Sequence, residues 1–173
     1  LQITGKGDYG EVRHMMIMGG GLTTYHVIQD KPDSVSVKVI EQNEERCRQF
    51  ADMLDDPDVS IIQGDGRDTG MLAEEGLRDM QAFAALTPYT ETNILACLAA
   101  KRMGVRKTIA MVENMDYVSL AEKLDIGTII NKKTIAASHI YQMMLDTDVA
   151  NVKCLTIANA DVAEFIASEG SIV

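Results

Sequence analysis

Short apolar segments alternate along most of the chain with stretches that carry apolar residues at helical spacing. Six of the short segments are typical of buried strands, because they are rich in apolar and β-branched residues and end at polar or turn-forming residues. These predicted strands cover residues 13–19, 34–40, 59–63, 81–86, 107–112 and 127–130. The stretches between and after them predict helices over residues 23–29, 44–54, 69–75, 90–103, 117–124 and 134–145.

Two of the predicted helices follow residues that favour the N-cap position. Asn43 is expected to cap the helix that begins at residue 44, and Asp116 the helix that begins at residue 117. In the long helix over residues 90–103, the spacing of Ile94, Leu95 and Leu98 predicts that these three side chains face the sheet.

Strands that alternate with helices at this spacing indicate βαβ units. Because crossovers between parallel strands are right-handed, the expected α/β fold is Rossmann-like: a doubly wound, mostly parallel six-stranded sheet with helices on both faces. Residues 13–150 would form this domain, and the polar, glycine-rich residues 1–12 are interpreted as a linker or leader. Residues 151–173 are interpreted as a strand and a short amphipathic helix (159–166) that open a second, truncated module.

Composition narrows the possible functions. The 173 residues include 16 Lys and Arg against 26 Asp and Glu, a formal net charge of −10, which argues against binding to nucleic acid or to anionic membranes. No apolar run approaches the roughly 18–20 residues of a membrane span, and the polar first residues do not suggest a signal peptide. The scattered Cys47, Cys97 and Cys154 are expected to be small core residues in a reducing cytosol.

A run of three glycines is the sharpest motif. Gly19, Gly20 and Gly21 follow a predicted strand and precede a predicted helix, which is the context of a dinucleotide-binding turn. Gly19 would permit the tight turn, and Gly21 would let the backbone approach a pyrophosphate at the helix N-terminus. Leu22, Thr23 and Thr24 complete the motif, with Thr24 in place of a third glycine.

Glu41 lies 22 residues after Gly19, at the end of the second predicted strand. A carboxylate there can accept hydrogen bonds from the ribose hydroxyls of adenosine and would repel a 2′-phosphate, which favours NAD(H) or an adenine nucleotide over NADP. Arg46 stands one helical turn further on. The alternative is that Glu41 is a solvated acid at a strand end.

Three further polar residues follow strands that end at the same edge of the sheet. Asp65 could reach adenine or its ribose, or could be a turn residue that bonds its own backbone. Thr87 could contact a phosphate or ribose. Glu113 could hold a cation that bridges phosphates, although a surface acid is the favoured interpretation.

Catalytic motifs are missing from the sequence. It contains no nucleophile elbow, no His-Glu-x-x-His zinc motif and no P-loop lysine. His139 and Lys132 are the titratable residues closest to a possible lip of the site, and surface or capping roles explain both. We therefore expect a binding protein rather than an enzyme.

Several motifs, in order along the chain, resemble the KTN/RCK family, and most closely the NAD-binding regulatory subunits of Trk potassium-uptake systems. The resemblance covers residues 13–145 and is carried by Gly19-Gly-Gly21, Val39-Ile-Glu41, Glu45-Arg-Cys47, Gly64-Asp-Gly66, Ala85-Leu-Thr87, Glu91-Thr-Asn93-Ile-Leu95, Ala100-Lys-Arg-Met-Gly104 and residues 126–130. The sequence departs from the family at Leu22, where an arginine would meet phosphates, and at Thr24, where a glycine is usual.

The resemblance implies a peripheral protein on the cytosolic face of the inner membrane that gates a Trk-type membrane potassium translocator. NAD, NADH or possibly ATP or ADP would bind at the predicted contact residues, which are Gly19, Gly21, Leu22, Thr23, Glu41, Asp65, Thr87 and Glu113. Dimers or larger rings are implied, with the helix over residues 134–145 as one contact. Residues 152–173 would begin the small C-terminal lobe of the family. Two alternatives remain: the cofactor-binding half of an NAD-dependent reductase, and a degenerate unit that only builds an oligomer.

Overall fold

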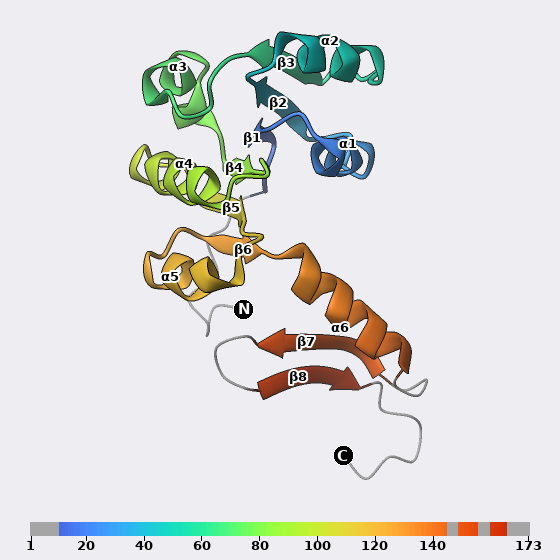
Figure 1. Ribbon diagram of the computed structural model, residues 1–173. Helices are drawn as coiled ribbons and strands as arrows, with labels where there is room; N and C mark the ends of the chain where they lie inside the picture. Colours follow the sequence, from blue (N-terminus) through green and yellow to red (C-terminus); the bar gives the residue numbers. More distant parts are fainter. Residues whose placement is uncertain (1–10, 145–148, 156–159, 166–173) are drawn as a thin grey trace. The chain divides into compact units, whose positions relative to one another are not determined.

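The structure, a computed structural model, describes residues 11–144 and the backbone of residues 149–155 and 160–165 (Figure 1). The chain divides into two units, with the division after Ile129.

The first unit is built on a six-stranded sheet with the order β3-β2-β1-β4-β5-β6. Its strands are β1 (His14–Met18), β2 (Ser36–Glu41), β3 (Val59–Gln63), β4 (Ala82–Ala85), β5 (Lys107–Met111) and β6 (Thr128–Ile130). The pairings β1–β2, β2–β3, β1–β4 and β4–β5 are all parallel. The order reverses direction between β1 and β4, which is the arrangement of a doubly wound Rossmann-like sheet. The predicted fold class is confirmed.

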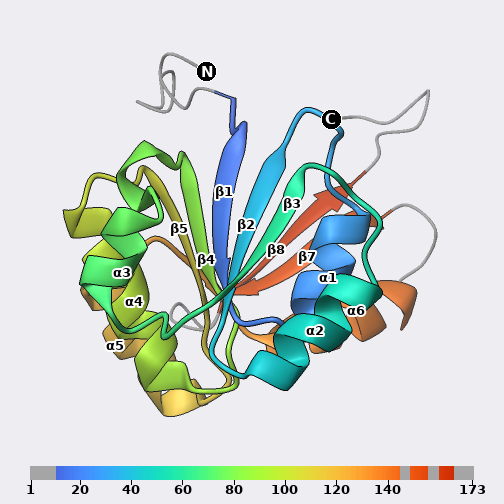
Figure 2. The ribbon, with the colours of Figure 1, turned by 90° about the horizontal axis from the view of Figure 1, so that it is seen from above.

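Helices cover both faces of this sheet. They are α1 (Leu22–Gln29), α2 (Glu44–Asp52), α3 (Thr69–Glu74), α4 (Thr90–Arg102) and α5 (Val118–Lys123), with the short 3₁₀ turns η2 (Leu77–Asp79) and η3 (Met115–Tyr117). Figure 2 shows α1 and α2 on one face and α3, α4 and α5 on the other.

Adjacent strand residues belong to separate hydrophobic clusters, which explains why the strands are apolar throughout. Met16 and Ile17 are both inaccessible to solvent, yet Met16 packs with Phe83 and Ile94 in one cluster, and Ile17 packs with Phe50 in the other. Because side chains alternate along a strand, each cluster fills the space between the sheet and one helical layer.

Two sequence predictions about helices need correction. Of the three residues predicted to face the sheet from α4, Ile94 is buried and Leu98 packs against the core, as expected, but Leu95 does not. Leu95 is 65% exposed, whereas Ala96 and Cys97 are buried, so the small residues of α4 face the sheet and the inward face is rotated away from Leu95. Asn114, not Asp116, caps the helical turn after β5: the Asn114 side chain accepts a hydrogen bond from the Asp116 backbone N–H at 3.0 Å. The capping residue is the earlier one because Asn114 still has extended backbone.

The second unit contains α6 (Lys132–Met144), β7 (Val149–Leu155) and β8 (Ala160–Phe165). β7 and β8 pair antiparallel. The predicted helix over residues 159–166 is therefore wrong, because pairing with β7 supplies the backbone hydrogen bonds of residues 160–165 in a strand. α6 has no buried residue and exposes large apolar side chains, which are Ile135, Ile140, Tyr141, Met143 and Met144. None of the helices in the described ranges is both long and apolar enough to cross a membrane.

Candidate functional site

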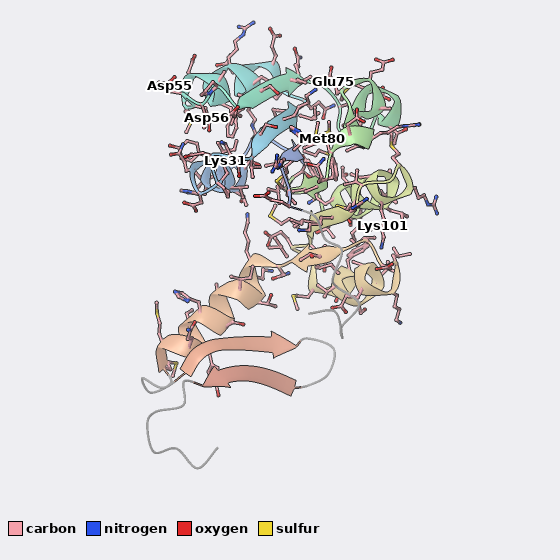
Figure 3. All side chains as sticks on the ribbon, turned by 180° about the vertical axis from the view of Figure 1, so that it is seen from behind. Lys31, Asp55, Asp56, Glu75, Met80 and Lys101 are labelled. Carbon is pink, nitrogen blue, oxygen red and sulfur yellow. The ribbon has the colours of Figure 1, made fainter. Side chains whose placement is uncertain are left out.

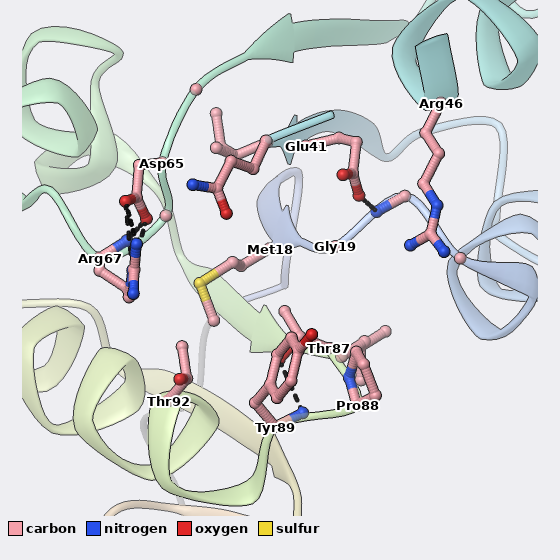
Figure 4. Close-up of a pocket in the computed structure, with 17 residues that line it drawn as sticks. Met18, Gly19, Glu41, Arg46, Asp65, Arg67, Thr87, Pro88, Tyr89 and Thr92 are labelled. Carbon is pink, nitrogen blue, oxygen red and sulfur yellow. Dashed lines mark hydrogen bonds and ion pairs between the residues drawn. The ribbon is translucent and has the colours of Figure 1, made fainter. Parts of the chain in front are cut away.

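A cleft opens at the carboxyl ends of β1, β2, β3 and β4, where the loops that follow these strands meet (Figure 4). This edge, next to the point where the strand order reverses, is where open α/β sheets bind ligands. Five of the predicted contact residues line the cleft, which are Gly19, Gly21, Glu41, Asp65 and Thr87. Leu22, Thr23 and Glu113 are not among the residues that line it.

The glycine turn has one residue that the fold requires and one that it does not. Gly19 has a φ of +106°, and a Cβ there would lie 3.2 Å from Thr87 Cγ2 and 3.3 Å from the Leu86 carbonyl carbon. Gly21 has an ordinary φ of −100°, and a Cβ there would have no neighbour within 4 Å. The turn therefore needs glycine at residue 19, whereas a side chain at residue 21 would enter open space beside the cleft.

The residues after the turn leave the cleft open. Leu22 is 70% exposed, and Thr24 is fully buried beneath the turn, where its hydroxyl donates a hydrogen bond to the Gly19 carbonyl. α1 begins after Gly21 without a side-chain cap. Its first backbone N–H groups therefore have no side-chain acceptor, and such groups favour an anion.

The Glu41 carboxylate joins the end of β2 to the glycine turn. Its Oε2 accepts a hydrogen bond from the Gly20 backbone N–H at 2.8 Å, and its Oε1 accepts one from the Asn43 N–H at 2.9 Å. Glu41 is only 8% exposed. A carboxylate has about four lone-pair positions, so each oxygen retains capacity for one more donor. Glu41 points toward the glycine turn, as the predicted ligand site requires.

Asp65 forms a tight pair with Arg67 across the turn that follows β3. The Arg67 guanidinium donates to both Asp65 oxygens at 2.7–3.1 Å, and the Arg67 backbone N–H donates to Oδ1 at 3.0 Å. The hydrogen bonds from Arg67 hold the pKa of the Asp65 carboxyl below its usual value. Asp65 thus has the turn role that the sequence left as an alternative, while it still lines the cleft.

The Thr87 hydroxyl is engaged by Asn93 of α4. It donates to Asn93 Oδ1 at 2.6 Å and accepts from the Tyr89 backbone N–H at 3.2 Å. Asn93 is fully buried, and its Nδ2 donates to the carbonyls of Thr87 at 2.7 Å and Met111 at 2.8 Å. This amide fixes the ends of β4 and β5, so Thr87 shapes the rim of the cleft.

Glu113 lies after β5, where its backbone N–H donates to the Thr90 hydroxyl at 3.1 Å. Across the described residues, no group of three or more His, Cys, Asp or Glu residues could hold a metal ion. Lys132 and His139 lie on α6 of the second unit.

Of the other residues that line the cleft, Arg46 is placed by the sequence one helical turn beyond Glu41 without an assigned contact, and no role is predicted for Arg67, Pro88, Tyr89 and Thr92. Arg46 is the first-turn residue of α2 whose backbone N–H bonds the Asn43 cap. A helix that begins at the cleft edge places its first-turn side chains beside that edge, so the position of Arg46 in the sequence could have predicted that it lines the cleft. A proline or a tyrosine in a loop gives no comparable indication of its position.

Cys47 is close to the cleft, and its surroundings disfavour the thiolate form. Its thiol donates to the Glu41 carbonyl at 3.4 Å, and burial together with the charge of Glu41 raises its pKa. Burial raises the pKa of Cys97 to about 12. Both thiols are therefore protonated at neutral pH. Cys97 is buried in the core as predicted, whereas Cys47 is only half-buried; the Cys154 side chain lies outside the described residues.

Comparison with curated proteins finds relatives over most of the chain. It is 30% identical over 165 residues to the Trk system potassium uptake protein TrkA homolog 2 of Methanosarcina mazei, covering 94% of this chain and 36% of that protein. It is 31% identical over 157 residues to the Trk system potassium uptake protein TrkA of Halomonas elongata, covering 91% of this chain and 34% of that protein. The chain spans about a third of the length of these relatives.

Solved structures share the fold at low sequence identity. The TrkA-N domain of the inner membrane protein ybaL from Escherichia coli has a TM-score of 0.64 at 13% identity, covering 78% of this chain and 98% of that one. The GsuK channel bound to NAD has a TM-score of 0.63 at 14% identity (80% of this chain, 26% of that one), and GsuK bound to ADP has 0.61 at 16% (76% and 34%).

The match to a protein family is continuous across the sheet and the cleft. Residues 15–132, which are more than half of the chain and include the glycine turn, Glu41, Asp65 and Thr87, match the TrkA-N domain family. This match confirms the resemblance seen in the sequence, and the chain belongs to the TrkA-N domain family.

Proposed function

We propose that this chain is the nucleotide-sensing part of a regulatory protein of potassium transport, and that its cleft binds the adenosine diphosphate moiety of NAD(H) or another adenine nucleotide. The observation that carries the proposal is the meeting of three features in one cleft: the open position at Gly21, the uncapped N-terminus of α1 and the inward-facing carboxylate of Glu41.

Each feature suits one part of such a ligand. The first N–H groups of α1 and the open space at Gly21 suit a diphosphate. The unused lone pairs of Glu41 suit the hydroxyls of a ribose, and its negative charge disfavours a 2′-phosphate. NAD, NADH, ADP and ATP share this adenosine diphosphate group, so all four are candidate ligands, whereas NADP is disfavoured.

The comparisons support both halves of the proposal. The relatives from Methanosarcina mazei and Halomonas elongata are Trk system potassium uptake proteins, and the GsuK structures of the same fold are bound to NAD and to ADP. For this chain we propose the regulation of a membrane potassium translocator from the cytosolic face of the inner membrane, without catalysis.

Regulation would act through paired domains. Apolar side chains exposed along α6, including Ile140 and Met143 at 59% and 72%, form a surface suited to a second copy of the chain. A ligand that favours one arrangement of a dimer or ring by about 1–3 kcal/mol would change gating about 5–150-fold.

The test of binding is calorimetric titration of NADH, NAD, ADP and ATP into the wild type, Gly21→Val and Leu22→Ala. A valine at residue 21 would occupy the diphosphate position, and the backbone there is extended, so Gly21→Val should abolish binding while the melting temperature is unchanged. Leu22→Ala, next to it but outside the cleft, should bind as the wild type does. Absence of binding to the wild type at millimolar nucleotide would refute the proposal in favour of a purely structural unit.

The test of pairing is light scattering after size-exclusion chromatography. Ile140→Asp should lower the measured mass toward that of one chain, whereas His139→Asp, which adds a similar charge at the neighbouring exposed position, should not.

The test of regulation is potassium uptake by cells that carry Gly21→Val in the full-length protein. Uptake that still responds to the nucleotide as in the wild type would separate the cleft from gating.

A further inference from the structure

Arg46 is a cation at the edge of the cleft with an unused guanidinium. Its backbone N–H donates to the Asn43 side chain at 2.9 Å, but its side chain makes no hydrogen bond or ion pair within the described part of the chain. The residue is exposed and lines the cleft. Figure 4 shows the Arg46 side chain extending from α2 toward the glycine turn, on the opposite side of Glu41 from Asp65 and Arg67.

The other charged side chains that line the cleft already form hydrogen bonds or ion pairs within the protein. Arg67 is bound to both oxygens of Asp65, so that pair contributes little net charge. Glu41 accepts hydrogen bonds from two backbone N–H groups and has no cationic side chain bound to it among the ion pairs of the described residues. Arg46 therefore balances Glu41, and without it the cleft would carry a net negative charge in a chain whose formal charge is already −10.

We propose that Arg46 binds the diphosphate of the nucleotide and thereby selects ligands with two or more phosphates over nucleosides. This inference rests on the proposed nucleotide site. A planar guanidinium can donate two parallel hydrogen bonds to phosphate oxygens, and the first turn of α1 contributes N–H groups but no cation, since it reads Leu-Thr-Thr. Arg46 supplies the positive charge from the neighbouring helix.

The geometry favours the diphosphate over a 2′-phosphate on the ribose. The Glu41 carboxylate is fixed against the glycine turn by its 2.8 Å bond to Gly20 and occupies the place where a 2′-phosphate would need a positive neighbour. The end of the Arg46 side chain lies on the glycine-turn side of that carboxylate, where the diphosphate of the proposed ligand would rest.

The experiment compares Arg46→Ala with Arg48→Ala. Arg48 lies on the same helix, is paired with Glu44 at the surface and does not line the cleft, so its removal changes the net charge equally. ADP, AMP, adenosine, NAD and NADP are titrated calorimetrically, with ligand-observed NMR for the weak binders. Arg46→Ala should weaken ADP and NAD roughly tenfold or more and leave adenosine unchanged, and Arg48→Ala should match the wild type. The ADP affinity of the wild type should also fall more steeply with salt than that of Arg46→Ala.

Each other outcome overturns the inference in a recognisable way. An equal loss of adenosine and ADP affinity would mean that the guanidinium stacks on the base. A loss confined to NADP would mean that it binds a 2′-phosphate. Unchanged ADP affinity in Arg46→Ala would remove the role of Arg46 alone, whereas a wild type that binds none of these ligands would remove the proposed function together with this inference.

Discussion

Replacing Asn93 with alanine should destabilise the protein and loosen the rim of the cleft. Asn93 is fully buried, and its amide makes four hydrogen bonds: two from the Thr87 backbone N–H and hydroxyl, and two to the carbonyls of Thr87 and Met111. It thereby connects α4 to the ends of β4 and β5. Alanine preserves the helix, since it has the highest helical propensity, so the loss falls on the hydrogen bonds.

The magnitude follows from which partners water can reach. The bond to Met111 is buried, so its carbonyl would be left unsatisfied, at a cost of roughly 1–3 kcal/mol. The three bonds to Thr87 are partly exposed, and water can replace them in part, so together they add about 1 kcal/mol. The expected loss of unfolding free energy is about 2–4 kcal/mol, which lowers the melting temperature by roughly 4–16 °C for a chain of this size.

The assay is urea denaturation followed by far-ultraviolet circular dichroism, because the chain contains no tryptophan. Leu95→Ala is the matched control: it removes a larger side chain from the same helix at a position that is 65% exposed, and should cost less than about 1 kcal/mol. A loss below 1 kcal/mol for Asn93→Ala, or a loss equal to that of the control, would refute the idea that this amide holds the strand ends in place.

Three smaller predictions concern the turns and the thiols. Gly19→Ala should lower stability by about 1–3 kcal/mol in a denaturation experiment, because the residue has a left-handed φ and its Cβ would press on Thr87. Arg67→Ala should raise the pKa of Asp65 in an NMR titration, because Arg67 lowers that pKa in the folded protein. The small contribution of the Asp65–Arg67 pair to stability is therefore present above about pH 4 and is lost as the pH falls through the folded-state pKa of Asp65. Cys97 as the single cysteine should resist iodoacetamide at pH 8 until the protein unfolds, because its pKa is about 12; rapid labelling of the native protein would contradict its burial.

The fold was predictable because its information is repeated along the sequence. Each strand is a short apolar run, each helix has an apolar face, and the alternation of the two leaves few topologies once crossovers are right-handed. The predicted third strand, residues 59–63, coincides with β3, and the predicted Asn43 cap accepts its hydrogen bond as expected. Local patterns of this kind need no knowledge of which distant segments meet.

The errors in the helix and strand predictions arise where contacts with a segment distant in the sequence determine the structure. Residues 160–165 have a helical apolar spacing, but they form a strand because β7 lies alongside. Leu95 fits the same helical pattern as Ile94, but α4 packs through its small residues, and Leu95 is left outside. Propensity is a weak prior in both cases, because tertiary pairing outweighs it.

The residues of the candidate site likewise differ in whether local sequence or distant contacts determine their role. Residues whose contribution comes from the backbone or from position at a strand end, such as Gly19 and Glu41, could be predicted from spacing. Thr87 and Asp65 also line the cleft as expected, but their side chains are hydrogen-bonded to Asn93 and Arg67. The spacing of residues in a sequence does not indicate which side chains will form hydrogen bonds with each other in the fold.

These internal bonds change which groups can meet a ligand. With the Thr87 hydroxyl held by a buried amide and the Asp65 carboxylate held by a guanidinium, the groups left for a ligand include the backbone N–H donors of α1, the remaining lone pairs of Glu41 and the guanidinium of Arg46. Such a site has donors and a positive charge at one place and a carboxylate beside it. This combination supports the proposed ligand, in which an anionic diphosphate stands next to a hydroxyl-bearing sugar.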